Sequence, residues 1–146
     1  MSYSSFELLD HSKPIVVFGR DGQVGRALQV CLKDLKTPVI FLGRSDCDLS
    51  NELSIRDVLN RYQPQVIINA AAYTAVDKAE TEVDKAFEIN TIGAKNLALV
   101  CNEQGAILIH ISTDFVFDGQ KNEPYTETDE ANPISVYGAS KLQGEV

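Results

Sequence analysis

Several kinds of feature are missing from this chain of 146 residues. No apolar run approaches the roughly 20 residues that cross a bilayer, so we expect no membrane segment. Three cysteines, Cys31, Cys47 and Cys101, are too scattered for a metal motif, and we expect no metal site. The opening Met1–Ser5 lacks the basic start and apolar core of a secretory signal. Together these absences indicate the reducing cytoplasm.

Positive charge is also scarce. Lysine and arginine total 13 against 21 acidic residues, which gives a formal net charge of −8. That charge repels phosphate backbones and excludes nucleic acid as an expected partner, although a local basic site for one cofactor phosphate is compatible with it. The length fits a single domain, which buries about two thirds of its unfolded surface and needs no disulfide staple.

Short β-branched and apolar runs alternate with segments of helical periodicity. The runs predict strands at residues 15–18, 39–42, 66–69 and 107–111. The periodic segments predict helices over residues 24–35, 54–62 and 81–103, and from 136 to 146. The third helix is expected to bury Val83, Phe87, Ala94, Leu97, Ala98 and Cys101. Residues 118–135, rich in Gly, Asn, Pro and acidic side chains, predict a surface loop.

This alternation predicts an α/β fold with a Rossmann-like, doubly wound parallel sheet. Right-handed crossovers and the doubly wound rule predict the strand order 3-2-1-4 for the four strands. We therefore expect residues 1–146 to form one NAD(P)-binding domain.

A glycine turn joins the first strand to the first helix. Gly19, Gly22 and Gly25 lie where missing side chains let the backbone approach a pyrophosphate at the helix N-terminus, together with Gln23 and Val24. The spacing G-x-x-G-x-x-G differs from the usual G-x-G-x-x-G, and three glycines in a tight turn can be purely structural. The strand-to-helix context favours cofactor binding.

The second strand ends at Gly43-Arg44, where NAD enzymes usually place a carboxylate on the ribose. Arg44 there, and Arg20 in the glycine turn, can instead recognise a 2′-phosphate. The alternative is two solvated arginines, with Asp46 or Asp48 taking the ribose. The sequence favours NADPH and leaves NADH open.

Tyr137 and Lys141 are four residues apart and therefore share one face of a helix. An adjacent ammonium favours phenolate and brings the tyrosine pKa toward the working range of a general acid. Thr113 follows the fourth strand, at the sheet edge where such folds bind ligands. Each feature has a plainer interpretation, because Y-x-x-x-K occurs by chance and Ser112 and Thr113 can simply end a strand.

Taken in order, the glycine turn, the Thr113 position and the Tyr-x-x-x-Lys helix resemble the extended short-chain dehydrogenases. Within them, Asn69–Glu80 and Ser112–Gly119 are similar to the dTDP-4-dehydrorhamnose reductases. Asn90 with the helix around it, and the stretch Tyr137–Glu145, extend the resemblance, which covers residues 15–146.

The resemblance implies a nucleotide-sugar substrate, dTDP-4-dehydro-L-rhamnose, whose C4 ketone is reduced by NADPH to give dTDP-L-rhamnose. It implies that Tyr137 is the general acid, that Lys141 lowers its pKa and binds the nicotinamide ribose, and that Thr113 holds the carbonyl oxygen. Phe115 stands where relatives commonly have tyrosine, and Gly43 where they often have an acidic residue.

The same resemblance assigns further contacts. For the cofactor these are Asp48, Leu49, Ala70, Ala71, Ala72, Tyr73 and Asn90, and for the substrate Thr74, Val76, Thr113, Phe115 and Tyr137. Other interpretations stay open: Asp48 can cap a helix, the alanines can serve close packing, and Asp77, Lys78 and Glu80 can cap and salt-bridge the long helix. His110 is interpreted as a core residue.

Relatives are about twice as long, and their second half supplies further strands and the sugar pocket. We therefore expect this chain to be the cofactor-binding half. A chain that stops at Val146 leaves the fourth strand as an open edge and exposes the apolar face of the last helix, which predicts a homodimer, aggregation or a longer gene product. Two rival functions are a nucleotide-binding module without turnover and a nucleotide-sugar epimerase or dehydratase; those enzymes usually lack the Asn69–Glu80 signature.

Overall fold

The computed structural model describes residues 10–146, so Met1–Ser5, where we expected no secretory signal, lies outside the described residues. Its centre is a sheet of four parallel strands. They are β1 (Ile15–Phe18), β2 (Val39–Leu42), β3 (Val66–Asn69) and β4 (Ile107–His110). Helices separate the strands along the chain, which confirms the predicted α/β fold with a parallel sheet.

The strand order is β2-β1-β3-β4, so the predicted order 3-2-1-4 was wrong. β3 pairs with β1, in the register Ile15 to Val66, and does not extend the sheet beyond β2. After β2 the chain forms turns in which Cys47 and Leu49 are buried. The winding direction therefore reverses one strand earlier than we expected, between β1 and β3. Such a reversal is where doubly wound sheets bind ligands.

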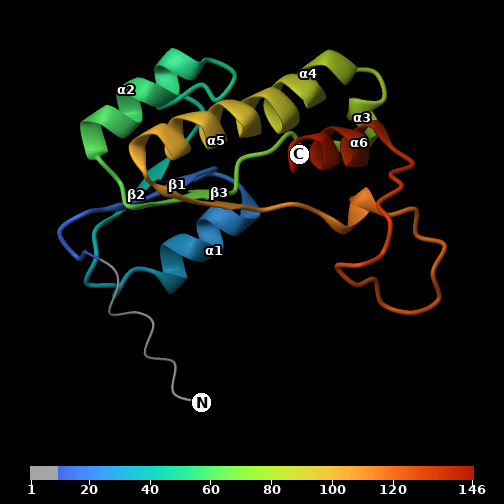
Figure 1. The fold of residues 1–146 in the computed structure, drawn as a ribbon, viewed down its shortest axis with the longest axis horizontal. Coiled ribbons are helices and arrows are strands. Elements are labelled where there is room, and N and C mark those ends of the chain that lie inside the picture. Colours follow the sequence, from blue (N-terminus) through green and yellow to red (C-terminus); the bar gives the residue numbers. More distant parts are fainter. Residues whose placement is uncertain (1–9) are drawn as a thin grey trace.

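Helices cover both faces of the sheet. In Figure 1, α2 (Glu52–Tyr62) and α5 (Gly93–Gln104) lie on one face and α1 (Gln23–Cys31) lies on the other. β1 is the best protected strand, because it has a partner on each edge and its residues are all buried. α1 ends at Cys31, four residues before the predicted end, and Leu35 is 40% exposed.

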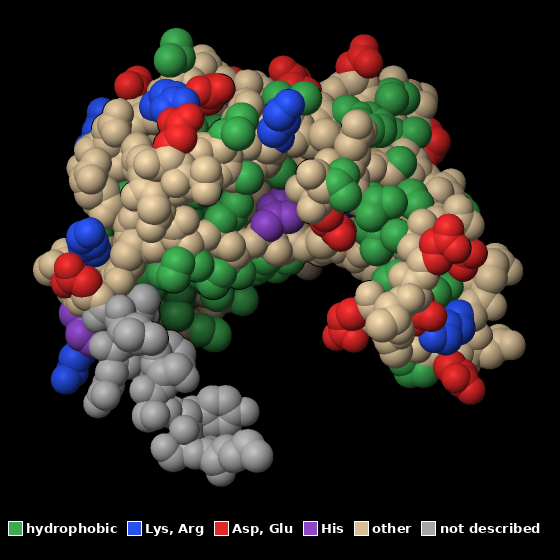
Figure 2. Space-filling model, viewed as in Figure 1, with side chains coloured by type: hydrophobic (Ala, Val, Ile, Leu, Met, Phe, Trp, Pro, Cys, Tyr) green, Lys and Arg blue, Asp and Glu red, His purple; other side chains and the backbone are tan. Residues whose placement is uncertain are grey.

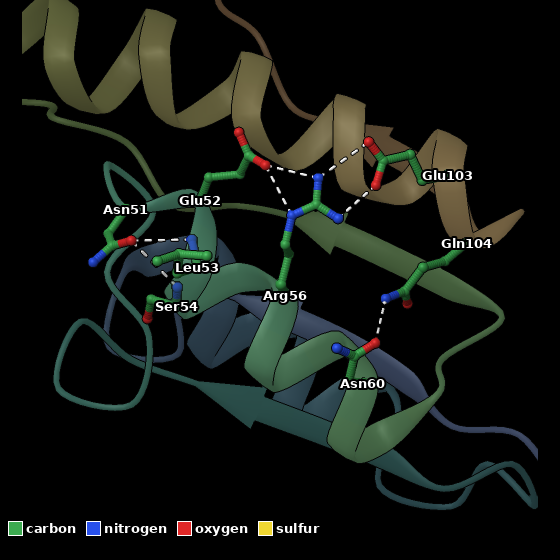
Figure 3. A network of polar contacts seen from close by, with 8 residues as sticks. All are labelled: Asn51, Glu52, Leu53, Ser54, Arg56, Asn60, Glu103 and Gln104. Carbon is green, nitrogen blue, oxygen red and sulfur yellow. Dashed lines mark hydrogen bonds and ion pairs between the residues drawn. The ribbon is translucent and has the colours of Figure 1, made fainter.

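Polar contacts join α2 to α5 (Figure 3). Asn51 caps α2, because its side chain accepts hydrogen bonds from the backbone N–H groups of Leu53 and Ser54. The guanidinium of Arg56 pairs with Glu52 in its own helix and with Glu103 in α5. These contacts fix α2 beside α5 on the outer side of the core.

The single long helix predicted over residues 81–103 is divided in the structure. It consists of α3 (Val76–Ala79), α4 (Val83–Phe87), the π-helical turn η2 (Glu88–Ile92) and α5. Val83 is 40% exposed and Ala98 is exposed, so their predicted burial was wrong. A π turn adds a residue to the helical repeat and rotates the faces that follow it, which the 3.6-residue pattern did not anticipate.

The last helix, α6 (Val136–Gln143), packs against the α3–α4 side of the molecule (Figure 1). Ser135 caps it by accepting from Gly138 N, and the Glu80 carboxylate accepts from Val136 N. Glu80 thus stabilises this helix and not the long helix that we considered. Tyr137 is buried and Leu142 partly buried, so the expected exposure of an apolar face on the last helix was wrong.

β4 is an edge strand, as expected, and one face of it is accessible. Ile107 and Ile109 are 59% and 49% exposed. Figure 2 shows hydrophobic side chains along the underside of the sheet, beside a recess that separates the body from the protruding loop. That loop runs through residues 118–135, as predicted, after the 3₁₀ turn η3 (Asp114–Val116). Between residues 10 and 146 no helix has the length and apolar character to cross a membrane.

Candidate functional site

Two glycines of the turn after β1 are required by backbone packing. Gly19 has a φ of +93°, and a Cβ there would lie 2.6 Å from the carbonyl carbon and oxygen of Ala70. A Cβ on Gly25 would lie 2.1 Å from the carbonyl oxygen of Gly19. At Gly22 the nearest atom would be 3.4 Å away, so that backbone is left accessible. The turn therefore combines a structural role for Gly19 and Gly25 with an open approach over Gly22.

The turn forms one wall of a cleft of about 990 Å³ at the carboxyl ends of β1, β2 and β3. Twelve of the predicted site residues line it: Gly19, Gly22, Gln23, Val24, Arg44, Asp48, Leu49, Ala70, Ala71, Ala72, Tyr73 and Thr74. Eight do not: Arg20, Gly25, Val76, Asn90, Thr113, Phe115, Tyr137 and Lys141. The cleft thus brings together most of the residues that were expected to contact the cofactor.

Other residues line the cleft that the sequence analysis missed. They are Asp21, Arg26, Leu42, Gly43, Ser50, Ala75, Lys85, Glu88 and Ile89. Arg26 was detectable, because it lies four residues after Gly22 and hence one turn into the helix that opens on the turn. The sequence did not reveal the three lining residues Lys85, Glu88 and Ile89, because the continuous 3.6-residue pattern hid the division of the long helix.

The arginines near the cleft differ in their partners. Arg20 donates through Nη1 to Asp46 Oδ2 at 2.7 Å and through Nε to Asp21 Oδ1 at 3.3 Å. The hydrogen bond to Asp21 and the charges of both carboxylates raise the pKa of Arg20 above its ordinary value. Arg44 and Arg26 line the cleft, and within residues 10–146 neither forms an ion pair or a side-chain hydrogen bond. They are the cations available to an anionic ligand.

The two candidate ribose carboxylates also differ. Asp46 Oδ2 accepts from Gly43 N and from Arg20, and Asp46 does not line the cleft. Asp48 lines the cleft and accepts through Oδ1 from the backbone N–H and hydroxyl of Ser50. The cap of α2 is Asn51, so the helix-cap interpretation of Asp48 was wrong.

Beyond β3 the cleft wall is shaped by Tyr73. Its hydroxyl donates to Glu82 Oε2 at 2.8 Å, and Lys85 lies over its ring at 5.6 Å while pairing with the same carboxylate. Burial, and then the hydrogen bond with Glu82, raise the pKa of Tyr73. This tyrosine is held as a neutral wall residue.

Asn90 joins this wall to α6. Its Oδ1 accepts from Tyr73 N at 2.8 Å, and its Nδ2 donates to Tyr73 O at 3.1 Å and to Ser140 Oγ at 2.9 Å. Thr91 adds a hydrogen bond from its hydroxyl to Ser140 O. Asn90 is 2% exposed, and the π turn η2 directs it inward. Its amide therefore uses both donors and one acceptor position to join α6 to the cleft wall.

The predicted catalytic side chains do not line the cleft. Tyr137 is 9% exposed, belongs to the same apolar cluster as Tyr73 and packs edge-on against Phe115, with ring centroids 5.5 Å apart. Thr113 Oγ1 accepts from Phe115 N at 3.2 Å, so part of its capacity serves the η3 turn. A Cβ on Gly138 would lie 2.2 Å from Phe115 O, and this close approach sets η3 against α6.

Lys141 lies one turn after Tyr137 and is 2% exposed. Its ammonium donates to the carbonyl oxygen of Ile111, at the end of β4, at 2.6 Å. Burial lowers the pKa of Lys141, and the Glu145 carboxylate acts in the opposite sense. An ammonium has three donors, so two are left for other acceptors.

His110 is a partly buried strand residue, in line with its interpretation as part of the core. Its Nδ1 is 3.0 Å from Asn69 Nδ2. Asn69 Oδ1 accepts from Ala71 N, which fixes the amide orientation. Nδ1 is therefore the acceptor and Nε2 carries the proton, and Nε2 is buried without a partner among the described residues. Burial lowers the pKa of His110.

The described residues contain no group of three or more His, Cys, Asp or Glu side chains that could hold a metal ion. Cys47 and Cys101 are buried as free thiols, and burial raises the pKa of both. They contribute to packing and not to the candidate site.

Comparison with known proteins identifies the family to which the chain is similar. The model of the RmlD substrate binding domain matches residues 13–146. A dTDP-4-dehydrorhamnose reductase of Escherichia coli strain K12 is 44% identical over 134 residues, which are 90% of this chain and 45% of that protein. The chain thus spans about half the length of the curated relatives that it matches.

Solved structures of dTDP-4-dehydrorhamnose reductases are also similar to this chain. A crystal structure of a dTDP-4-dehydrorhamnose reductase from Clostridium acetobutylicum is 48% identical, with a TM-score of 0.88, over 90% of this chain and 47% of that one. A dTDP-4-dehydrorhamnose reductase from Bacillus anthracis, solved in complex with NADP, is 40% identical with the same TM-score over 91% of this chain and 47% of that one.

Proposed function

The chain belongs to the RmlD substrate binding domain family, and on that premise we propose that it is the nicotinamide-nucleotide-binding half of a dTDP-4-dehydrorhamnose reductase. In this proposal residues 1–146 form one NAD(P)-binding domain, and the pocket for the nucleotide sugar lies outside them. The complete enzyme reduces the C4 ketone of dTDP-4-dehydro-L-rhamnose to give dTDP-L-rhamnose.

The observation that carries the proposal is the junction at Asn90. Three hydrogen bonds from one buried amide tie the cleft wall at Tyr73 to Ser140, which lies between Tyr137 and Lys141 on α6. A nucleotide cleft and a tyrosine-lysine helix are thereby joined through a fixed contact. That arrangement suits a reaction in which a hydride is delivered to the carbon, and a proton to the oxygen, of one carbonyl group.

The glycine turn fits a dinucleotide. Gly19 and Gly25 cannot carry a side chain, while the open backbone at Gly22 lets a pyrophosphate approach the N-terminus of α1. Arg44 and Arg26 supply positive charge in the same cleft, which favours NADPH over NADH. NADPH supplies the hydride when bound.

The chain's own residues would handle the proton. In this proposal Tyr137 donates its hydroxyl proton to the developing alkoxide, and Thr113 holds the carbonyl oxygen by a hydrogen bond. Lys141 stabilises the phenolate that remains and binds the nicotinamide ribose. For that contact its ammonium has two donors beyond the one given to Ile111 O.

The first test is a titration of the purified chain with NADPH and with NADH, followed by nicotinamide fluorescence. Addition of dTDP-4-dehydro-L-rhamnose then tests for oxidation of the nucleotide. We expect saturable binding with a lower Kd for NADPH. Failure to bind either nucleotide would overturn the proposal.

Tyr137→Phe tests the catalytic assignment wherever turnover is measured. We expect kcat to fall by about 100-fold or more with an unchanged Kd for NADPH, because only the proton donor is lost. Tyr125→Phe is the matched control: Tyr125 stacks on Phe117 in the surface loop and donates to Asp118. Equal effects of the two changes on kcat would contradict the role of Tyr137.

A second candidate is a nucleotide-binding module without turnover. The observation that favours it is the position of Lys141, whose ammonium donates to a backbone carbonyl and which does not line the cleft. Saturable binding without oxidation of NADPH would support this candidate. The proposal also includes a cytoplasmic location and a homodimer. Light scattering would test the homodimer.

A further inference from the structure

The end of β2 carries a glycine whose side-chain space is filled by an ion pair. A Cβ on Gly43 would lie 2.6 Å from Asp21 Oδ2 and 2.8 Å from Arg20 Nη2. The guanidinium of Arg20 and the carboxylate of Asp21 therefore rest against the bare backbone of Gly43. A larger residue at this position would displace them.

The guanidinium of Arg20 also pairs with the carboxylate of Asp46, which follows β2. Asp46 Oδ2 accepts from Arg20 Nη1 at 2.7 Å and from Gly43 N at 2.7 Å. A carboxylate just after the second strand is the group that binds a ribose hydroxyl in NAD enzymes. Here that carboxylate is present, but it is paired with Arg20, which it shares with Asp21, and one of its oxygens already accepts two hydrogen bonds.

We propose that Arg20 determines nucleotide specificity by masking Asp46, and that it does not itself hold the 2′-phosphate. The inference rests on the proposed nucleotide-binding function. Asp46 does not itself line the cleft, but its side chain is 36% exposed and it accepts from the backbone of Gly43, which does. Unmasked, it would repel the 2′-phosphate of NADPH and would be open to a hydrogen bond from the 2′-hydroxyl of NADH. With Arg20 in place that penalty is removed, and Arg44 and Arg26, which line the cleft, attract the phosphate.

A direct contact between Arg20 and the 2′-phosphate would give a different pattern of NADPH affinities from the masking of Asp46. If Arg20 bound the phosphate, losing it would weaken NADPH binding whatever residue stood at position 46. If Arg20 masks Asp46, losing Arg20 is harmful only while the carboxylate is there. The double variant therefore separates the two roles.

The experiment measures Kd for NADPH and for NADH, by nicotinamide fluorescence at one fixed ionic strength, for the unaltered chain and four variants. They are Arg20→Gln, Asp46→Asn, the double variant, and Arg56→Gln as control. Arg56 is also an arginine paired with two carboxylates, but it belongs to α2, pairs with Glu52 and with Glu103 of α5, and does not line the cleft. Circular dichroism confirms that each variant is folded.

We expect Arg20→Gln to reduce the preference for NADPH over NADH by about tenfold, because a negative charge near the 2′-position becomes unbalanced. Affinity for NADH stays constant or rises. Asp46→Asn keeps the preference within about twofold. The double variant recovers it to within about threefold, because the carboxylate at position 46 is then absent and only Asp21, the more distant of the two partners of Arg20, is left unpaired. Arg56→Gln leaves both Kd values unchanged.

Two results would overturn the masking role. One is a double variant that binds NADPH as weakly as Arg20→Gln, and the other is an unchanged preference in Arg20→Gln. An unaltered chain that binds both nucleotides equally would overturn it too. An unaltered chain that binds neither would instead defeat the proposed function. Adenosine 2′,5′-bisphosphate, used as a competitor, carries the 2′-phosphate without the nicotinamide. We expect its Kd to change among the variants as the Kd for NADPH does.

Discussion

The two ends of the candidate site are held together by different means. At the nucleotide end, around β1 and α1, backbone meets backbone: Gly19 lies against Ala70, and Gly25 lies against Gly19. At the catalytic end, around β4 and α6, buried polar side chains make the contacts, chiefly Asn90 and Lys141. The nucleotide end depends on the absence of side-chain atoms. The catalytic end has such a contact too, where a Cβ on Gly138 would lie 2.2 Å from Phe115 O, but it depends in addition on buried hydrogen bonds.

This difference bears on how each end can change. Backbone atoms in contact cannot move aside, so an added methyl group at the nucleotide end has no low-energy rotamer to adopt. A buried hydrogen-bonding network can lose a member and keep its shape, but the partners that remain are left unsatisfied. Apart from the contact at Gly138, we therefore expect the nucleotide end to be the more sensitive to added side-chain volume and the catalytic end to be the more sensitive to lost hydrogen bonds.

The largest effect should come from Gly25→Ala. The new Cβ would lie 2.1 Å from Gly19 O, so β1 and α1 must separate, and we expect the free energy of unfolding to fall by about 3–5 kcal/mol. Urea denaturation measures it. Gly105→Ala is the matched control: its φ of +68° is strained for alanine, but nothing lies within 4 Å, so about 1 kcal/mol is expected. Similar losses at both positions would contradict the packing argument.

Gly22→Ala sharpens the same contrast. Its Cβ would have no neighbour closer than 3.4 Å, so we expect a stability change within about 1 kcal/mol of zero. The affinity for NADPH should nevertheless fall by about tenfold or more, because the methyl group stands where the pyrophosphate approaches. Unchanged affinity, measured by the same fluorescence titration, would place the pyrophosphate elsewhere.

A smaller loss is expected at the catalytic end for Asn90→Ala. Three hydrogen bonds disappear, and Tyr73 N, Tyr73 O and Ser140 Oγ lose this partner, which costs about 2–4 kcal/mol. Gln104→Ala is the control, since its side chain makes one exposed hydrogen bond to Asn60 and should change stability by less than about 0.5 kcal/mol. Equal losses would mean that the network adds nothing beyond surface contacts.

Local pattern was enough to predict most of the nucleotide end. Three strands match their predicted bounds, because each is a short apolar run closed by a glycine, an asparagine or a turn. Most of the predicted nucleotide contacts line one cleft for the same reason: the strand ends and the glycine turn follow directly from the chain order. Which strands are neighbours in the sheet does not follow from the chain order. The predicted strand order was therefore wrong, because β3 pairs with β1.

The catalytic end was harder to predict, because its geometry depends on contacts between distant residues. The π turn at η2 interrupts a helix whose apolar spacing looks continuous, and it is this turn that directs Asn90 inward. Arg20 was interpreted as a phosphate ligand from its place in the glycine turn. Its ion pair with Asp46, 26 residues away, is a tertiary contact without a local signal.

The smallest predicted effect concerns His110 and pH. Burial lowers its pKa in the folded chain below the ordinary 6.5, a shift that Lys141 reinforces and Glu145 opposes. Between the two pKa values the unfolded chain binds more protons, so the free energy of unfolding rises with pH through a window that ends near 6.5. Protonation at Nδ1 would also remove the acceptor for Asn69.

His110→Gln should flatten that slope between about pH 5 and 6.5, the interval that lies above the ordinary carboxylate pKa values and reaches that of histidine. Urea denaturation at several pH values measures it. His11→Gln is the control, because His11 is the other histidine of the chain and is exposed. It shows whether the effect comes from the partly buried ring of His110 or from the loss of any histidine. If His110→Gln keeps the slope of the unaltered chain, the buried Nε2 is not the source of the pH dependence, and the catalytic end is less sensitive to protonation than its polar network indicates.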